Sequence, residues 1–169
     1  MLDLVPEISN FGRGPGPQSF PFQDLNLGLQ VCYEGLFPDF SRQLADQGSQ
    51  IFINLTNDSW FGTWAEPLQH LYMTFGRAIE FRRPLVRITN TGISTAITAS
   101  GKIQEFTASN TEAIQLVQIP YHEKPTKTLF ARYGQNIPYV LFLMLVGLLF
   151  SFSQTKPKNE QEKTGDKHV

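Results

Sequence analysis

An uncharged apolar run near the C-terminus constrains the fold of this 169-residue chain more than any other sequence feature. Residues 137–152 carry no charge and are apolar apart from Tyr139 and Ser151. As a helix the run would rise about 24 Å, against a bilayer hydrocarbon core of roughly 30 Å. We therefore predict a transmembrane helix, with a buried core helix as the alternative, because apolar runs of this length are ambiguous.

This run separates one domain from a polar end. The length preceding it suffices for about one domain. The segment after it contains four lysines, but basic residues also precede the run, so the orientation across the membrane stays open. The predicted organisation is a domain over residues 1–125, a juxtamembrane linker over 126–136, the span over 137–152 and a polar tail over 153–169.

Composition narrows the class of protein. Hydrophobic residues make up 41% and charged residues 17%, which excludes a wholly disordered chain. The net charge is -1 and no stretch gathers enough positive charge to follow a phosphate backbone, so nucleic acid is not expected as a partner. The single cysteine, Cys32, excludes an internal disulfide and a multi-cysteine zinc site. It is either a buried packing residue or a reactive group.

Strand and helix patterns alternate in the first half of the domain. Residues 25–31 alternate apolar and polar positions, which predicts a strand, and the apolar run 51–55 predicts a strand covered on both faces. Between them Asp39 can cap a helix that ends at Gly48. A longer helix is predicted to begin at Pro67, where an apolar stripe with helical spacing starts.

The second half is predicted to be a strand meander. Strand patterns occur at residues 85–89, 94–99, 102–106 and 113–117, with Ser100-Gly101 as a two-residue hairpin turn. Together the two halves predict a layered α/β or α+β domain.

The place of Cys32 suits a nucleophile. It follows a predicted strand and precedes a helix, and a helix N-terminus lowers the pKa of a thiol. Glu34 is two residues on, so in an extended backbone its carboxylate would lie beside the thiol. On position alone, a packing cysteine remains the commoner interpretation.

For the histidine and arginines outside the cysteine region, the sequence favours structural roles. His70 is expected on the polar side or edge of its helix, and no metal site is expected because it lacks other ligands at suitable spacing. Four arginines near the end of that helix are predicted to form a solvated or ion-paired face with Glu80: Arg77, Arg82, Arg83 and Arg87.

An aromatic cluster occupies the loop after residues 51–55. Trp60, Phe61 and Trp64 form either a satellite core or an exposed anchor for an apolar substrate or a membrane, and the sequence leaves both open.

Six short motifs follow one another in a characteristic order. They are VCYE at residues 31–34, NLTNDSWFG at 54–62, PLQH at 67–70, RAIE at 77–80, RPLVR at 83–87 and NTGIS at 90–94. In order and spacing they resemble the apolipoprotein N-acyltransferases, membrane-bound members of the nitrilase (carbon-nitrogen hydrolase) superfamily. The resemblance covers about residues 10–152.

The resemblance implies a two-step acyl transfer without metal or cofactor. The Cys32 thiolate would attack a phospholipid ester to form a thioester, and the N-terminal amine of a diacylglyceryl-cysteine apolipoprotein would then accept the acyl chain. Glu34 matches the acidic residue next to the family nucleophile. Tyr33, Asn57 and Trp60 are the implied substrate-binding residues. The implied location is the bacterial inner membrane, with the catalytic domain on the periplasmic face in the complete family.

One departure from the family pattern concerns the other catalytic groups. The family uses a Glu base and an oxyanion-stabilising Lys upstream of the cysteine, whereas the first lysine here is Lys102. The chain therefore resembles a C-terminal portion, a partial αββα sandwich with exposed sheet edges followed by the span. A separately encoded N-terminal half would have to complete it. The alternatives are a non-catalytic remnant that binds lipid or a partner and, less favoured, a nitrilase-type amidase.

Overall fold

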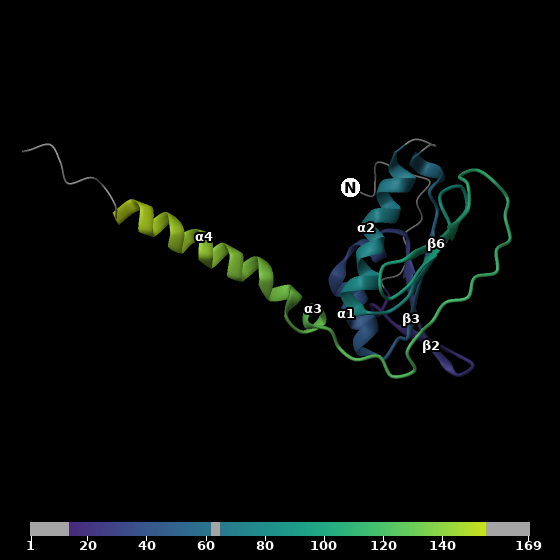
Figure 1. Ribbon diagram of the computed structural model, residues 1–169, viewed down its shortest axis with the longest axis horizontal. Coiled ribbons are helices and arrows are strands. Elements are labelled where there is room, and N and C mark those ends of the chain that lie inside the picture. Colours follow the sequence, from purple (N-terminus) through teal and green to yellow (C-terminus); the bar gives the residue numbers. More distant parts are fainter. Residues whose placement is uncertain (1–13, 62–64, 155–169) are drawn as a thin grey trace, which may run out of the picture. The chain divides into compact units, whose positions relative to one another are not determined.

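A six-stranded mixed sheet forms the framework of the domain in this computed structural model, which describes residues 14–61 and 65–154 (Figure 1). The strands lie side by side in chain order: β1 Ser19–Phe22, β2 Leu25–Val31, β3 Ile51–Thr56, β4 Leu85–Thr89, β5 Thr95–Ile97 and β6 Ile103–Phe106. The helices are α1 Pro38–Asp46, α2 Glu66–Phe81, α3 Leu129–Tyr133 and α4 Ile137–Gln154, with short 3-10 helices at Cys32–Leu36, Ser59–Phe61 and Gly134–Asn136. The chain divides into two units between Arg132 and Tyr133.

The central strands establish the α/β class. Strands β2, β3 and β4 are parallel, α1 connects the first two, and α2 connects the second two. Strands β1, β5 and β6 pair antiparallel at the edges. Parallel strands end at a common edge, so the residues after β2, β3 and β4 lie near one another. That edge carries Cys32 and Asp58.

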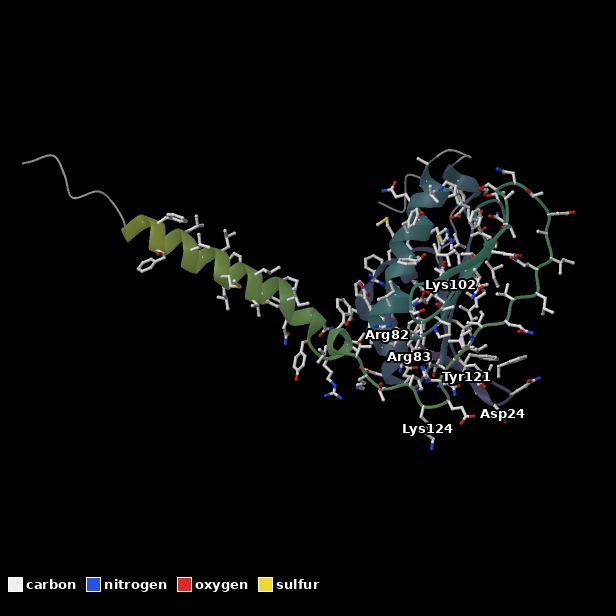
Figure 2. All side chains as sticks on the ribbon, viewed as in Figure 1. Asp24, Arg82, Arg83, Lys102, Tyr121 and Lys124 are labelled. Carbon is white, nitrogen blue, oxygen red and sulfur yellow. The ribbon has the colours of Figure 1, made fainter. Side chains whose placement is uncertain are left out.

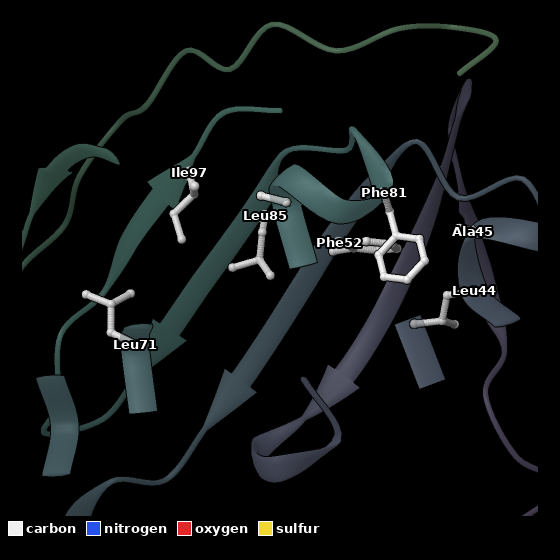
Figure 3. Close-up of a cluster of buried hydrophobic side chains, with 8 residues drawn as sticks. Leu44, Ala45, Phe52, Leu71, Phe81, Leu85 and Ile97 are labelled. Atoms are coloured by element: carbon white, nitrogen blue, oxygen red, sulfur yellow. The ribbon is translucent and has the colours of Figure 1, made fainter. Parts of the chain in front are cut away.

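The hydrophobic core lies between one sheet face and the helices α1 and α2. Figure 3 shows Phe52 and Leu85 of the sheet facing Leu44 of α1 and Phe81 of α2. The rings of Phe52 and Phe81 meet edge to face, with centroids 6.0 Å apart. This packing fixes α2 against the sheet. The predicted apolar stripe is only partly buried, since Leu68, Tyr72 and Ile79 are exposed.

The opposite sheet face carries apolar side chains that remain accessible. Strand alternation places Leu29, Ile53 and Val86 in one row across the sheet, and Val31, Leu55 and Ile88 in the next. Four of these six side chains are 36 to 60% exposed: Leu29, Val31, Leu55 and Ile88. The prediction that residues 51–55 are covered on both faces is therefore wrong at Leu55, because helices cover only one face of the described sheet. We call these two rows the apolar sheet face.

The meander is shorter than predicted. Strands β5 and β6 form the expected hairpin, but Thr98 and Lys102 pair around a three-residue loop in which Gly101 has a φ of +88°. Residues 113–117, predicted as a strand, do not pair with the described sheet. Their alternating pattern is typical of a strand, but Ile114 and Leu116 project fully into solvent because no described strand adjoins them.

Helix α1 begins differently from the prediction and ends as expected. Its N-cap is Phe37, Pro38 is its first residue, and Asp39 instead pairs with Arg42, at 2.6 Å. Gly48 follows the helix with a φ of +87°, a conformation that suits glycine.

Helix α4 is apolar on all sides. An 18-residue window within Leu129–Ser153 has a mean hydropathy of 1.9, and the region is long enough to cross a membrane. The structure thus contains a candidate membrane span.

Candidate active site

Cys32 occupies a left-handed turn at the end of β2. Its φ is +51°, which is uncommon for a residue other than glycine and costs roughly 1 to 2 kcal/mol. It begins the 3-10 helix Cys32–Leu36, and the residue is partly exposed. The thiol residue is therefore presented on a sharp turn at the sheet edge rather than sealed in the core.

Glu34 braces this turn. Its Oε2 accepts a hydrogen bond from the backbone N–H of Val31 at 2.6 Å. The expectation of an extended backbone, with the Glu34 and Cys32 side chains on the same side, is wrong because the chain turns into a 3-10 helix at Cys32. The carboxylate is thus bound to the backbone on the other side of the cysteine, which helps to hold the turn.

Asn54 binds the cysteine backbone from β3. Its side chain is fully buried, and its Nδ2 donates to the carbonyl oxygen of Cys32 at 3.0 Å. Its Oδ1 accepts hydrogen bonds from the hydroxyl of Thr56 and from Nη1 of Arg87, the latter at 3.0 Å. Strand β3 therefore supplies a bridge between the turn and a buried arginine.

Gly35 allows the turn to approach these side chains. A Cβ at this position would lie 3.0 Å from Asn54 Nδ2, 3.0 Å from Thr74 Cγ2 and 3.1 Å from Gln30 Oε1. Such contacts are tighter than those of most Cβ atoms, so a larger residue here would push the turn, β3 or α2 apart by a few tenths of an ångström.

A buried ion pair lies beneath the same edge. Arg87 of β4 and Asp58 have fully buried side chains, and Arg87 Nη2 donates to Asp58 Oδ2 at 2.8 Å. The other carboxylate oxygen, Oδ1, accepts a hydrogen bond from His70 Nδ1 at 3.1 Å. Of the two alternatives expected for Arg87, the solvated face is wrong because the side chain is buried, and the ion pair is observed with Asp58 rather than with Glu80.

His70 connects this ion pair to Tyr33. Its ring is almost fully buried and stacks on the Tyr33 ring with centroids 4.9 Å apart and planes at 27°. Of the two expected positions, the polar side of α2 is therefore wrong, whereas the edge of the apolar stripe agrees with the burial. Burial lowers the pKa of His70 below 6.5, and nearby Arg87 lowers it further, although Asp58 and Glu66 oppose the shift. His70 Nε2 has no hydrogen-bond partner in the described structure, which agrees with a neutral ring that carries its proton on Nδ1.

The remaining arginines differ in their surroundings. Arg77 pairs with Glu80 at 2.8 Å, as predicted, but it is mostly buried. Figure 2 labels Arg82 and Arg83 together, yet Arg83 is buried and donates to the carbonyls of Ser49 and Phe81. Burial lowers the pKa of Arg83, while Asp46 opposes that shift. Of the two predicted alternatives, the solvated face is thus wrong for Arg77 and Arg83, whereas the ion pair is observed for Arg77.

Asn57 and Trp60 lie in the loop after β3. Asn57 Oδ1 accepts hydrogen bonds from Ser59 and from Asn90 Nδ2, the last at 2.6 Å. Trp60 is 79% exposed, which favours the exposed-anchor alternative over a satellite core. Trp64 lies outside the described residues, and so does the side chain of Phe61.

A cleft of about 440 Å³ lies on strands β4 and β5. Its lining includes Ile88, Asn90 and Gln115, whereas Cys32 does not line it. The cleft therefore extends the apolar sheet face toward residues 107–117 and is separate from the cysteine turn.

Sequence reasoning from motifs found Cys32 and its immediate neighbours, but it missed the buried network of Asn54, Asp58, His70 and Arg87. These residues lie inside the quoted motifs. One signal of burial was available in the sequence. Side chains alternate between the two faces of β4, so Arg87 lies on the same face as the buried Leu85.

Comparison with known proteins identifies the family. The carbon-nitrogen hydrolase family model matches residues 5–123. The chain is 46% identical over 151 residues to the apolipoprotein N-acyltransferase of Bdellovibrio bacteriovorus, a match that covers 87% of this chain and 27% of that protein. It is 38% identical over 131 residues to that of Geobacter metallireducens, covering 78% of this chain and 25% of the relative. The chain thus spans about a quarter of the length of these relatives.

The fold comparison agrees. The crystal structure of a carbon-nitrogen hydrolase from Helicobacter pylori G27 aligns with a TM-score of 0.53 at 19% identity, covering 60% of this chain and 43% of that chain. The recognised resemblance and the predicted α/β nitrilase-like fold are confirmed. The chain belongs to the carbon-nitrogen hydrolase family, and its curated relatives are apolipoprotein N-acyltransferases.

Proposed function

We propose that this chain supplies the nucleophilic cysteine of an apolipoprotein N-acyltransferase. The observation that carries the proposal is the partly exposed Cys32, held in a left-handed turn at the common edge of three parallel strands. The names and identities of the relatives support the same reaction. The proposed substrates are a membrane phospholipid and a diacylglyceryl-cysteine apolipoprotein.

The reaction proceeds in two steps. The Cys32 thiolate forms a bond to the ester carbonyl carbon of the phospholipid, the ester C–O bond breaks, and the lysophospholipid oxygen takes up a proton. The apolipoprotein amine then bonds to the thioester carbonyl carbon, loses a proton to a base, and releases the thiolate.

The candidate site residues have distinct proposed roles. Glu34, bound to the Val31 N–H, holds the turn and places negative charge near the site. Tyr33 and the exposed Trp60 border the acyl chain, and Asn57 holds the Trp60 loop through Ser59 and Asn90. These roles require the side chains to lie beside the turn when lipid binds.

The general base and the cationic group that stabilises the oxyanion are proposed to come from the part of the αββα sandwich that lies outside this chain's match to its relatives. The apolar sheet face is the proposed surface for that part, because Leu29, Val31, Leu55 and Ile88 would be removed from water by a second sheet. Such packing would also bring residues of the second sheet to the edge that carries Cys32.

Helix α4 is proposed to anchor this assembly in the bacterial inner membrane, with the catalytic domain at the periplasmic face. Its length and uniform apolarity support a span. A membrane position would bring the phospholipid donor to the enzyme.

A chimaera tests the proposal. The chain replaces the matched 151 residues of the Bdellovibrio relative, and N-acylation of a diacylglyceryl peptide is measured in membranes. We expect transfer by the chimaera and a loss of at least about 10³-fold in C32A, as removal of a covalent nucleophile requires. An inactive chimaera that is folded and inserted would favour the alternative, a non-catalytic remnant that binds lipid or a partner.

A further inference from the structure

The guanidinium of Arg87 is connected through other side chains to both Cys32 and Tyr33. Arg87 is fully buried, with Nη1 bonded to Asn54 at 3.0 Å and Nη2 bonded to Asp58 at 2.8 Å. A guanidinium holds such partners in a fixed plane, which an ammonium group cannot do. Two branches therefore start from one rigid group.

The first branch ends on the cysteine itself. Asn54 turns its Oδ1 toward Arg87 and its Nδ2 toward the carbonyl oxygen of Cys32, at 3.0 Å. The arginine thus fixes which way the amide is oriented, because only the oxygen can accept from it. The branch restrains the peptide that follows the thiol-bearing residue.

The second branch ends on the next residue. Asp58 bridges Arg87 and His70, and the His70 ring supports the Tyr33 ring at 4.9 Å. Because Asp58 accepts the Nδ1 proton, it fixes both the tautomer and the plane of the imidazole. The branch restrains the side chain adjacent to the cysteine.

We propose that Arg87 is a positioning residue for the nucleophile, acting through Asn54 on the Cys32 carbonyl and through Asp58 and His70 on Tyr33. This inference rests on the proposed function, in which Cys32 attacks the acyl donor. Cys32 has a φ of +51°, and an unfavourable backbone conformation persists only where the surroundings over-determine it. The two branches supply that restraint, and Arg87 itself does not touch the substrate.

A purely structural role would have another consequence. Arg87, Asp58 and His70 also join β4, the loop after β3 and α2, so their loss could lower stability without altering the thiol. The two roles are distinguished by the reactivity of Cys32 in protein that remains folded.

The experiment uses the full chain in detergent micelles. Because Cys32 is the only cysteine, its alkylation by iodoacetamide is followed by intact mass, with near-ultraviolet circular dichroism confirming the fold. Rates are taken across alkaline pH to the plateau at which the thiol is fully ionised, so that a change in thiol ionisation does not affect the comparison.

Three variants probe the branches. H70A removes both the stack on Tyr33 and the hydrogen bond to Asp58, whereas H70F keeps an aromatic ring and removes only the hydrogen bond. R87K keeps the positive charge but cannot hold Asn54 and Asp58 together. F81L is the matched control, because Phe81 lies eleven residues further along α2, in the core against Phe52.

We expect the plateau rate to fall at least tenfold in folded H70A and R87K, to fall at least threefold in H70F, which loses the bond to Asp58, and to be unchanged in F81L. A plateau rate in H70A that equals or exceeds the parent value contradicts the proposal, as does an H70F variant that keeps the parent rate. Should R87K fail to fold, the two His70 variants still decide. Iodoacetamide needs no acyl donor, so a failed acyl-transfer assay and a failed positioning test are separate results.

Discussion

At the scale of single residues, the cysteine turn depends on side chains that are distant in sequence. Asn54 binds the Cys32 carbonyl from β3, and Arg87 reaches Asn54 from β4. Both polar side chains are fully buried, where an unsatisfied group would be costly. The turn is therefore a property of the folded sheet edge and not of the VCYE motif by itself.

His70 makes a prediction about pH. Its pKa is lowered in the folded protein, chiefly by burial, so the unfolded chain binds its proton more readily. Stability from this group is complete above about pH 6.5 and is lost as the pH falls below that value. We expect the urea midpoint of the parent to fall more steeply than that of H70F between pH 7.5 and 5.5. Parallel midpoints for the two proteins would refute the burial of a neutral His70.

Motifs could locate Cys32, Tyr33 and Glu34 because these residues are neighbours in the sequence. The roles of Asp58, His70 and Arg87 could not be found in this way. A histidine on a helix or an arginine in a strand acquires a buried partner only when the elements pack, and local pattern assigns such charges to the surface by default. Arg87 lies two residues after the buried Leu85 in β4, so the alternation of the strand places both side chains on the buried face. The sequence pattern did not show which residue would pair with the buried arginine.

At the scale of elements, helices and strands with strong patterns form where their periodicity predicts them. Helix α2 and strands β2, β3 and β4 form where their patterns predict them. The buried face of α2 differs from the predicted stripe, because it includes the polar residues His70, Thr74 and Arg77. Residues 113–117 do not, because a strand needs a neighbouring backbone and periodicity reports only the side chains. The hairpin also differs by one residue, since Gly101 takes the left-handed position of a three-residue loop.

Two glycines make an element-scale prediction. A Cβ at Gly92, between β4 and β5, would lie 1.9 Å from Asp58 Oδ2, so G92A must displace the carboxylate from Arg87. We expect G92A to cost on the order of 3 kcal/mol in the free energy of unfolding, as for a broken buried ion pair. G76A is the matched control: Gly76 lies inside α2 with only ordinary contacts, and alanine there should stabilise by about 0.5 to 1 kcal/mol. Urea unfolding of both variants measures whether each change lowers or raises the free energy of unfolding. Equal changes in G92A and G76A would contradict the close approach of Gly92 to Asp58.

At the scale of the whole molecule, the domain is a helix-covered sheet with a second face that remains apolar. Helices α1 and α2 bury Phe52 and Leu85, whereas Leu55 and Ile88 on the reverse side stay accessible. The chain spans about a quarter of the length of its relatives. These two facts together favour a second layer that packs on the apolar sheet face.

Assembly with that layer makes a prediction of its own. L55D introduces a charge on the apolar sheet face, and because Leu55 is 45% exposed it should change the stability of the chain by no more than about 0.5 to 1 kcal/mol. Co-purification with the complementary portion of the Bdellovibrio relative should fall at least tenfold, because the charge would be buried without a partner. M73D, at an exposed position of α2, should leave co-purification unchanged. Equal capture by L55D and the parent chain would contradict this assignment of the surface.

The covalent state of Cys32 after reaction with the acyl donor alone tests the proposed nucleophile most directly. The chimaera described above is incubated with phospholipid and no acceptor peptide, quenched in acid, and analysed by intact and peptide mass spectrometry. The account predicts one acyl group on Cys32, bound as a thioester that hydroxylamine removes, and none in C32A. Acyl transfer to peptide that continues in C32A, or an active chimaera in which Cys32 never gains acyl mass, would contradict it.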